Sequence, residues 1–189
     1  MDYIVQVVEE LTGKLEQLDK AGLIEILKQY ALYDDKVRSD LQLRFSRPDE
    51  VLEVAKQRFR ASFEPCYQRG KHYVRYNDAY EALFGANAVM MIAENGAGFA
   101  PRERMLMCFT VLEEMGRVFN DIDDSGQLGM VVSDAIKCIT SLAAEISSTE
   151  RYALLEEHLQ RGRALYDFCP DWKLDLLEAI NSAVVECYG

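Results

Sequence analysis

Proline and glycine are scarce in this chain, and it has no long apolar run. Its 189 residues include four prolines and eleven glycines. Both residue types destabilise helices, so their scarcity permits long ones. No apolar stretch approaches the ~20 residues that span a bilayer, which predicts a chain that does not cross a membrane. The beginning also lacks a basic stretch before an apolar core, so we expect no secretory signal.

Histidine is rare, and the cysteines are widely spaced. Neither His72 nor His158 has a cysteine or second histidine at zinc-ligand spacing, so we expect no metal and no cofactor. The cysteine count is five, an odd number with no closely spaced pair, which favours reduced thiols in a cytoplasmic protein. Cys108 and Cys138 lie on apolar helical stripes, so buried packing is a better interpretation than catalysis.

Catalytic motifs are also missing. The sequence has no glycine-rich phosphate loop, no Gly-x-Ser-x-Gly and no His-Glu-x-x-His. The adjacent pairs Glu113–Glu114 and Glu156–Glu157 point about 100° apart on a helix, so we expect solvated faces rather than catalytic dyads. We therefore predict no catalytic residue and no enzyme.

Acidic residues outnumber basic ones, giving a net charge of −11. This excess disfavours binding to nucleic acid or to an anionic membrane through the whole surface. Hydrophobic residues make up 49% of the chain, enough for a core. We therefore predict one folded domain, residues 1–189, with a soft division near 70–77.

Apolar residues recur at helical spacing along almost the whole chain. The first segment has Ile4, Val7, Val8, Leu11, Leu15 and Leu18 in register. The fold class that we predict is all-α, with about nine antiparallel helices in an irregular, α-solenoid-like array of helix pairs or a compact bundle. Short loops are expected near 46–48, 70–77, 96–100, 121–127 and 167–171.

An acidic segment resembles the first half of a calcium-binding loop. Its oxygen-bearing residues are followed by Gly126, as in an EF-hand, but the twelfth position is Val132 instead of a bidentate glutamate. We therefore favour a structural turn and helix cap, with calcium binding at or beyond the millimolar range. The residues of this acidic turn are Asp121, Asp123, Asp124 and Ser125.

The stretch from Lys56 to Arg75 is basic and rich in aromatics. It holds six Lys and Arg residues against one acidic residue, Glu64. This composition is typical of a phosphate or nucleic-acid surface, but a helix with inward aromatics and ion-paired arginines explains it as well. The candidate contacts to a partner or a nucleic acid are Arg58, Arg60, Arg69, Lys71 and Arg75.

Three segments carry a family resemblance, spread over residues 15–147. They are Leu18–Leu41, Gly70–Tyr80 and Phe109–Gly129. Together they resemble the helical region found in bacterial proteins beside SWIM-type zinc fingers, although Lys36 stands where that family usually has proline. The zinc module is absent here. The resemblance implies a helical fold and contact with another macromolecule.

These observations predict a non-enzymatic helical interaction or scaffold module in the cytoplasm, which binds a protein partner. The alternative is an accessory domain that contacts nucleic acid through residues 56–75. Salt-dependent nucleic-acid binding would favour the alternative, because phosphate contacts release counterions. The sequence predicts neither the identity of the partner nor the oligomeric state.

Overall fold

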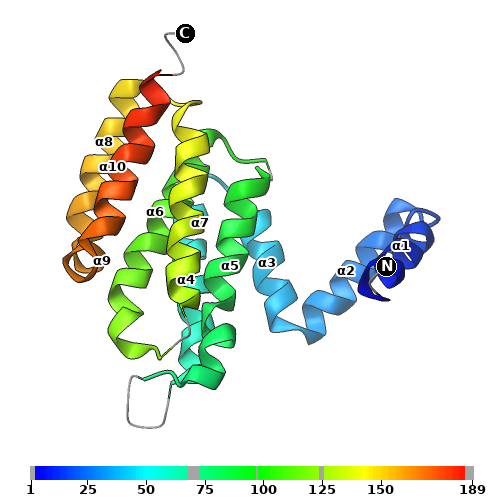
Figure 1. The fold of residues 1–189 in the computed structure, drawn as a ribbon. Helices are drawn as coiled ribbons and strands as arrows, with labels where there is room; N and C mark the ends of the chain where they lie inside the picture. Colours follow the sequence, from blue (N-terminus) through cyan, green and yellow to red (C-terminus); the bar gives the residue numbers. More distant parts are fainter. Residues whose placement is uncertain (1–2, 68–72, 97, 124–125, 186–189) are drawn as a thin grey trace. The chain divides into compact units, whose positions relative to one another are not determined.

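The computed structural model describes residues 3–67, 73–96, 98–123 and 126–185 (Figure 1). These residues form ten α-helices and no strand, which confirms the predicted all-α class. Nor does any helix within these ranges have the length and apolar character to cross a membrane. The helices are α1 (Tyr3–Leu15), α2 (Lys20–Tyr33), α3 (Asp35–Arg44), α4 (Val51–Phe63), α5 (Ala79–Asn95), α6 (Pro101–Val118), α7 (Gln127–Ala143), α8 (Ser148–Arg161), α9 (Arg163–Phe168) and α10 (Pro170–Val185).

The chain divides into two compact units. The N-terminal unit is Met1–Gln42 and the C-terminal unit is Leu43–Gly189, so the boundary falls inside α3. The segment 70–77, where the sequence suggested a soft division, lies within the C-terminal unit.

Most of the expected helix boundaries coincide with local signals. The side chain of Asp19 caps α2 by accepting a hydrogen bond from the backbone N–H of Gly22 at 2.7 Å. Ser147 caps α8 in the same way. Gly96 ends α5 in the left-handed conformation, with φ 74°. Pro101 occupies the first turn of α6.

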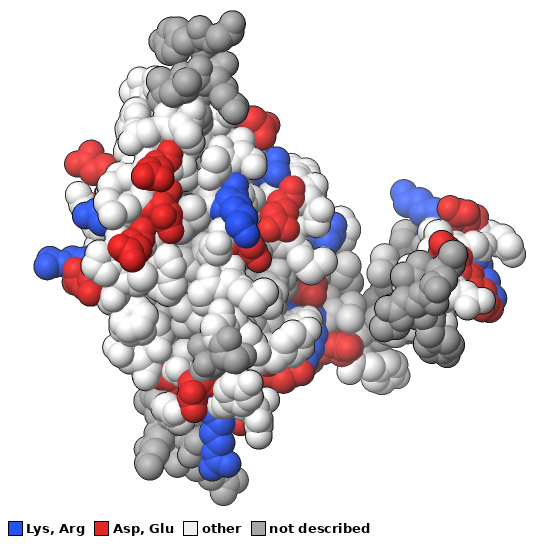
Figure 2. Space-filling model, in the orientation of Figure 1, with Lys and Arg blue, Asp and Glu red and all other residues white. Residues whose placement is uncertain are grey.

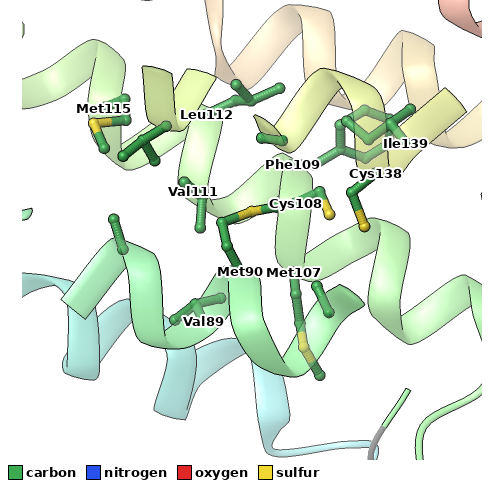
Figure 3. Packing of buried hydrophobic residues seen from close by; sticks show 14 of the residues in the cluster. Val89, Met90, Met107, Cys108, Phe109, Val111, Leu112, Met115, Cys138 and Ile139 are labelled. Atoms are coloured by element: carbon green, nitrogen blue, oxygen red, sulfur yellow. The ribbon is translucent and has the colours of Figure 1, made fainter. Parts of the chain in front are cut away.

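Helix α6 lies at the centre of the C-terminal unit, in contact with α4, α5, α7, α8 and α9 (Figure 1). Every residue from Met105 to Gly116 is buried. Such all-round burial is typical of a helix inside a core rather than an amphipathic surface helix. Figure 3 shows how Phe109, Leu112 and Met115 of this helix pack among the buried apolar side chains.

Two glycines permit the closest helix contacts. A Cβ atom at Gly85 of α5 would collide with the carbonyl oxygen of Arg58 in α4. One at Gly116 of α6 would lie 2.8 Å from the backbone nitrogen of Leu165 in α9. The absence of a side chain at both positions therefore lets α4 and α9 pack directly onto their neighbours.

One predicted helix is two helices in the structure. The helical spacing of Tyr152, Leu155, Leu159, Gly162 and Tyr166 predicts one continuous helix, but α8 ends at Arg161 and α9 begins at Arg163. A Cβ atom at Gly162 would lie 2.9 Å from Cε1 of His158. The break gives ten α-helices in the described ranges instead of nine, and it turns Tyr166 toward His158.

Candidate functional site

The first two predicted contact residues in the basic stretch support the fold. Arg58 is buried, and its guanidinium lies 5.1 Å from the ring centroid of Phe84. Arg60 forms a bidentate ion pair with Glu114 of α6, with both N–O distances 2.7 Å. Arg58 is therefore not a surface contact, and the prediction was wrong for this residue because α4 buries this side against α5.

Of the other three predicted contact residues, one lies in the described ranges. Arg75 is exposed, whereas Arg69 and Lys71 lie outside those ranges. The aromatic rings of Phe59 and Phe63 are buried and stack with centroids 5.0 Å apart. On the face of the C-terminal unit in Figure 2, basic and acidic side chains are interspersed rather than gathered by sign.

The acidic turn is attached to the loop before α5. The backbone N–H of Val74 donates to the carbonyl oxygen of Asp121 at 2.5 Å, and that of Asp123 donates to the carbonyl of Val74 at 3.0 Å. Burial raises the pKa of Tyr67, and the negative charge of Asp121 raises it further. Asp124 and Ser125 lie outside the described residues.

The expected helix cap is not formed by Asp121. Helix α7 begins at Gln127, and its N-cap residue is Gly126, in the left-handed conformation with φ 92°. Asp121 instead ends a short 3-10 helix, Phe119–Asp121, that follows α6. Its contribution to stability therefore comes from the bridge to Val74 rather than from capping α7.

A buried network joins α6, α8 and α9. His158 has no exposed surface and stacks on Phe109, with ring centroids 4.3 Å apart. Its Nδ1 lies 3.2 Å from Oε1 of Glu113, and its Nε2 lies 2.5 Å from the hydroxyl of Tyr166. Nε of Arg161 donates to the same Glu113 oxygen at 3.0 Å.

The network corrects the expectation that Glu113 and Glu114 face solvent. Both carboxylates are buried, and each contacts a different set of partners. Glu113 meets His158 and Arg161, whereas Glu114 meets Arg60 and Arg117. A sequence signal was present, because the surrounding residues of α6 are apolar on every side. By contrast, Glu156 and Glu157 are exposed as expected.

The hydrogen bonds fix the protonation states. Burial lowers the pKa of His158, although Glu113 opposes this shift. Burial alone would raise the pKa of Glu113, but His158 and Arg161 outweigh it and lower that pKa. At neutral pH a neutral His158 therefore donates from Nδ1 to the Glu113 carboxylate and accepts the Tyr166 proton at Nε2. Burial raises the pKa of Tyr166 as well, so its hydroxyl remains a donor.

Acid should weaken the fold through this imidazole. Because the pKa of His158 is lowered in the folded state, the unfolded chain binds more protons below about pH 6.5, the ordinary histidine value. The free energy of unfolding should fall with pH there, by at most about 1.4 kcal/mol per pH unit. Chemical unfolding from pH 7.5 to 5 measures this slope. It should flatten in His158→Gln but persist in His72→Gln, and an unchanged slope in His158→Gln would contradict the assignment.

Because the network around His158 is buried, we assign it a structural role. Both ring nitrogens of His158 are occupied, and the side chain meets no solvent from which a substrate could approach. Within the described ranges, no three His, Cys, Asp or Glu side chains gather closely enough to hold a metal ion. Large exposed apolar side chains occur in both units, and in the N-terminal unit several of them share one side of a helix.

Apolar side chains of the N-terminal unit are exposed. No side chain from residue 6 to residue 42 is buried. Val8, Leu11 and Leu15 lie along one side of α1 with exposed fractions of 54%, 51% and 42%. We call these three residues the α1 stripe. Their spacing of three and four residues is that of a seam between two helices.

Helix α2 adds a second apolar surface. Ile26, Tyr30 and Tyr33 line a hollow of about 430 Å³ together with Gln29 and Asp34, and we call it the α2 hollow. Tyr30 is exposed, and Tyr33 is among the most exposed large side chains described. A hydrophobic hollow with the amide of Gln29 and the carboxylate of Asp34 at its edge can bind an apolar side chain that has a polar neighbour.

Comparisons with protein-family models, curated proteins and solved structures found no match for this chain. The resemblance to the region beside SWIM-type zinc fingers stays a prediction. Function is therefore inferred from the geometry within each unit. Sequence periodicity identified the α1 residues, but it predicted a buried stripe and could not show that the side chains are exposed in the single chain.

Proposed function

We propose that the chain is a non-enzymatic interaction module whose N-terminal unit binds a helix of a partner protein. The observation that carries the proposal is the α1 stripe, three large apolar side chains on one side of a helix and all exposed. Contiguous exposed apolar surface marks interaction sites, whereas scattered single residues need no explanation.

Helix energetics supports a bound partner. Helices of 13 and 14 residues, the lengths of α1 and α2, are marginal in water without tertiary packing. Such packing comes from burying an apolar side, and full burial of a leucine contributes roughly 1.5–3 kcal/mol. None of the described side chains of α1 and α2 is buried in the single chain. A partner surface would supply that packing.

The spacing indicates the chemistry of the partner. Val8 and Leu15 fall at one seam position of a seven-residue pattern and Leu11 at the other. This pattern fits the ridges of another amphipathic helix. Beside the stripe, Lys14 forms an ion pair with Glu10 at 2.6 Å, so these two charges are matched within α1. Binding should therefore depend on apolar contact and only weakly on salt.

Charged residues in the α1 stripe should abolish capture of the partner. We expect Leu11→Asp with Leu15→Asp to weaken binding about 100-fold, because each change removes apolar burial and places a charge at the seam. The measurement is affinity purification with mass spectrometry from the native host, followed by titration of the captured protein. Leu174→Asp is the control, because Leu174 is a similarly exposed leucine in the C-terminal unit.

Three outcomes would contradict the proposal. The double variant and the Leu174→Asp control could capture the same proteins as the unmodified chain. Light scattering could show a dimer that only the double variant dissociates, which would make a second copy the occupant. Finally, hydrogen exchange could show α1 protected in the isolated monomer, which would mean that the chain covers its own stripe.

A further inference from the structure

Two cysteines from different helices lie together in the C-terminal unit. Cys108 belongs to α6 and Cys138 to α7, and these helices pack against each other. Figure 3 shows the sulfur atoms of both residues near each other among the buried side chains. Cys108 has no exposed surface, whereas Cys138 retains 7%. Solvent therefore reaches Cys138 but not Cys108.

A polar pocket gives access to the second thiol. Cys138 lines a pocket of about 300 Å³ whose other lining residues include Glu94, Arg104, Asp134 and Lys137. Cys108 is not part of the lining and has no exposed surface. A small polar solute can therefore reach one sulfur only, and the other sulfur is positioned to react with it next.

The guanidinium of Arg104 is fixed at this pocket. Its Nε donates to the carbonyl oxygen of Ala93 at 2.6 Å, and its Nη2 donates to that of Glu94 at 2.8 Å. These two bonds satisfy carbonyls at the end of α5 and hold a positive charge near both thiols. A fixed cation beside a thiol favours the thiolate.

The two thiols differ in acidity. The neighbouring Cys108 thiol lowers the pKa of Cys138 and Arg104 acts in the same direction, against burial and the negative charge of Glu94, which raise it. The neighbouring Cys138, together with burial, raises the pKa of Cys108. Cys138 is therefore the more acidic thiol and the better nucleophile, and Cys108 stays protonated beside it.

We propose that Cys108 and Cys138 form a peroxide-sensitive dithiol, in which hydrogen peroxide oxidises Cys138 and Cys108 then closes a disulfide. The small size of peroxide fits a residue that is only 7% exposed and lines a pocket, whereas a peptide disulfide would need a wider approach. This site is independent of the interaction proposed for the N-terminal unit.

The chemistry balances with peroxide as the only oxidant. The Cys138 thiolate attacks one peroxide oxygen, the O–O bond breaks, and the departing hydroxide takes a proton to become water. The product is a sulfenic acid at Cys138. The sulfur of Cys108 then attacks that sulfur, its S–H proton leaves with the hydroxyl as a second water, and an S–S bond forms. Two thiols are oxidised, and one peroxide is reduced to two waters.

The test uses the full chain treated with hydrogen peroxide, followed by a thiol-blocking maleimide and peptide mapping. Cys66 and Cys169 are partly exposed and serve as internal references in the same molecule. We expect complete loss of free thiol at Cys108 and Cys138, with a peptide cross-linked between them, at peroxide doses that leave the references largely reduced. The reduced chain should be recovered with a dithiol reductant.

Single variants separate the two roles. In Cys108→Ser, Cys138 should stop at a sulfenic acid that dimedone traps, whereas in Cys138→Ser, Cys108 should remain reduced at the same dose. Because either variant could fold poorly, the mapping of the unmodified chain decides the question by itself. If Cys108 and Cys138 stay reduced while Cys66 and Cys169 oxidise, the pair is buried packing only and the proposal is overturned.

Discussion

Combined Arg60→Ala and Arg117→Ala should lower the free energy of unfolding by about 3 kcal/mol, the lower end of the cost of leaving a buried charge unpaired. Their shared partner, Glu114, is only 2% exposed. Arg60 binds both of its carboxylate oxygens, and Nη1 of Arg117 lies 2.9 Å from one of them. Without the two arginines, the buried Glu114 carboxylate loses both of these ion pairs. The lower end applies because both arginines are about half exposed, so water already screens them.

Urea unfolding followed by circular dichroism measures this loss. The control is Arg102→Ala, because Arg102 pairs at 3.1 Å with the much more exposed Glu150, and such surface pairs contribute at most about 1 kcal/mol. Arg60→Lys with Arg117 intact should cost less than the double change, since a positive charge remains but the bidentate geometry is lost. A double variant as stable as the unmodified chain would show that the Glu114 carboxylate finds other compensation.

The same ion pair changes how the nucleic-acid alternative should be tested. Substituting Arg58 and Arg60 would disturb the contacts of α4 with its neighbours, so any lost binding would be confounded by lost stability. Arg75 is exposed, as Arg60 is, but it lies outside α4. A change in salt-dependent binding on substituting Arg75, with unfolding free energy unchanged, would be informative where substitutions at Arg58 and Arg60 are not.

Local signals predicted most of the fold because helix ends depend on nearby residues. Asp19, Ser147 and Gly96 act on groups within one turn of their own positions, so a sequence pattern contains the whole interaction. Among the described residues, the predicted loops 46–48 and 96–100 lie between observed helices, whereas most of 167–171 is helical, because α9 ends at Phe168 and α10 begins at Pro170. The break at Gly162 was missed, since the apolar helical pattern continues across it from Leu159 to Tyr166.

Long-range contacts explain what the sequence could not predict. The sequence predicted that Glu113 and Glu114 face solvent, because their partners lie more than 40 residues away, in α4 and α8. The meeting of Cys108 with Cys138 has the same origin, since helical periodicity shows that each is on an apolar side but not which side faces which. For the α1 stripe, periodicity predicted burial and the single chain leaves it exposed.

Glu113→Ala should also cost about 3 kcal/mol, while Glu113→Gln should cost about 1 kcal/mol. Alanine removes the acceptor of the His158 Nδ1–H inside the core, which costs about 1–3 kcal/mol, and it deletes buried side-chain volume as well. Glutamine has nearly the same shape, and its amide oxygen can still accept that hydrogen bond. It loses only the charge that attracts Arg161, which is partly exposed.

Urea unfolding of the two variants at pH 7, compared with the unmodified chain, distinguishes two contributions to stability. One is the hydrogen-bond acceptor for His158, and the other is the negative charge of Glu113. The pH dependence gives a second readout. The lowered pKa of Glu113 contributes stability above the ordinary carboxyl value near pH 4.5, and this contribution disappears as acid protonates the group. Both variants should lack that part of the acid loss, because neither side chain titrates. If glutamine proves as damaging as alanine, the charge pair with Arg161 holds α8 to α6, and the hydrogen bond to His158 is secondary.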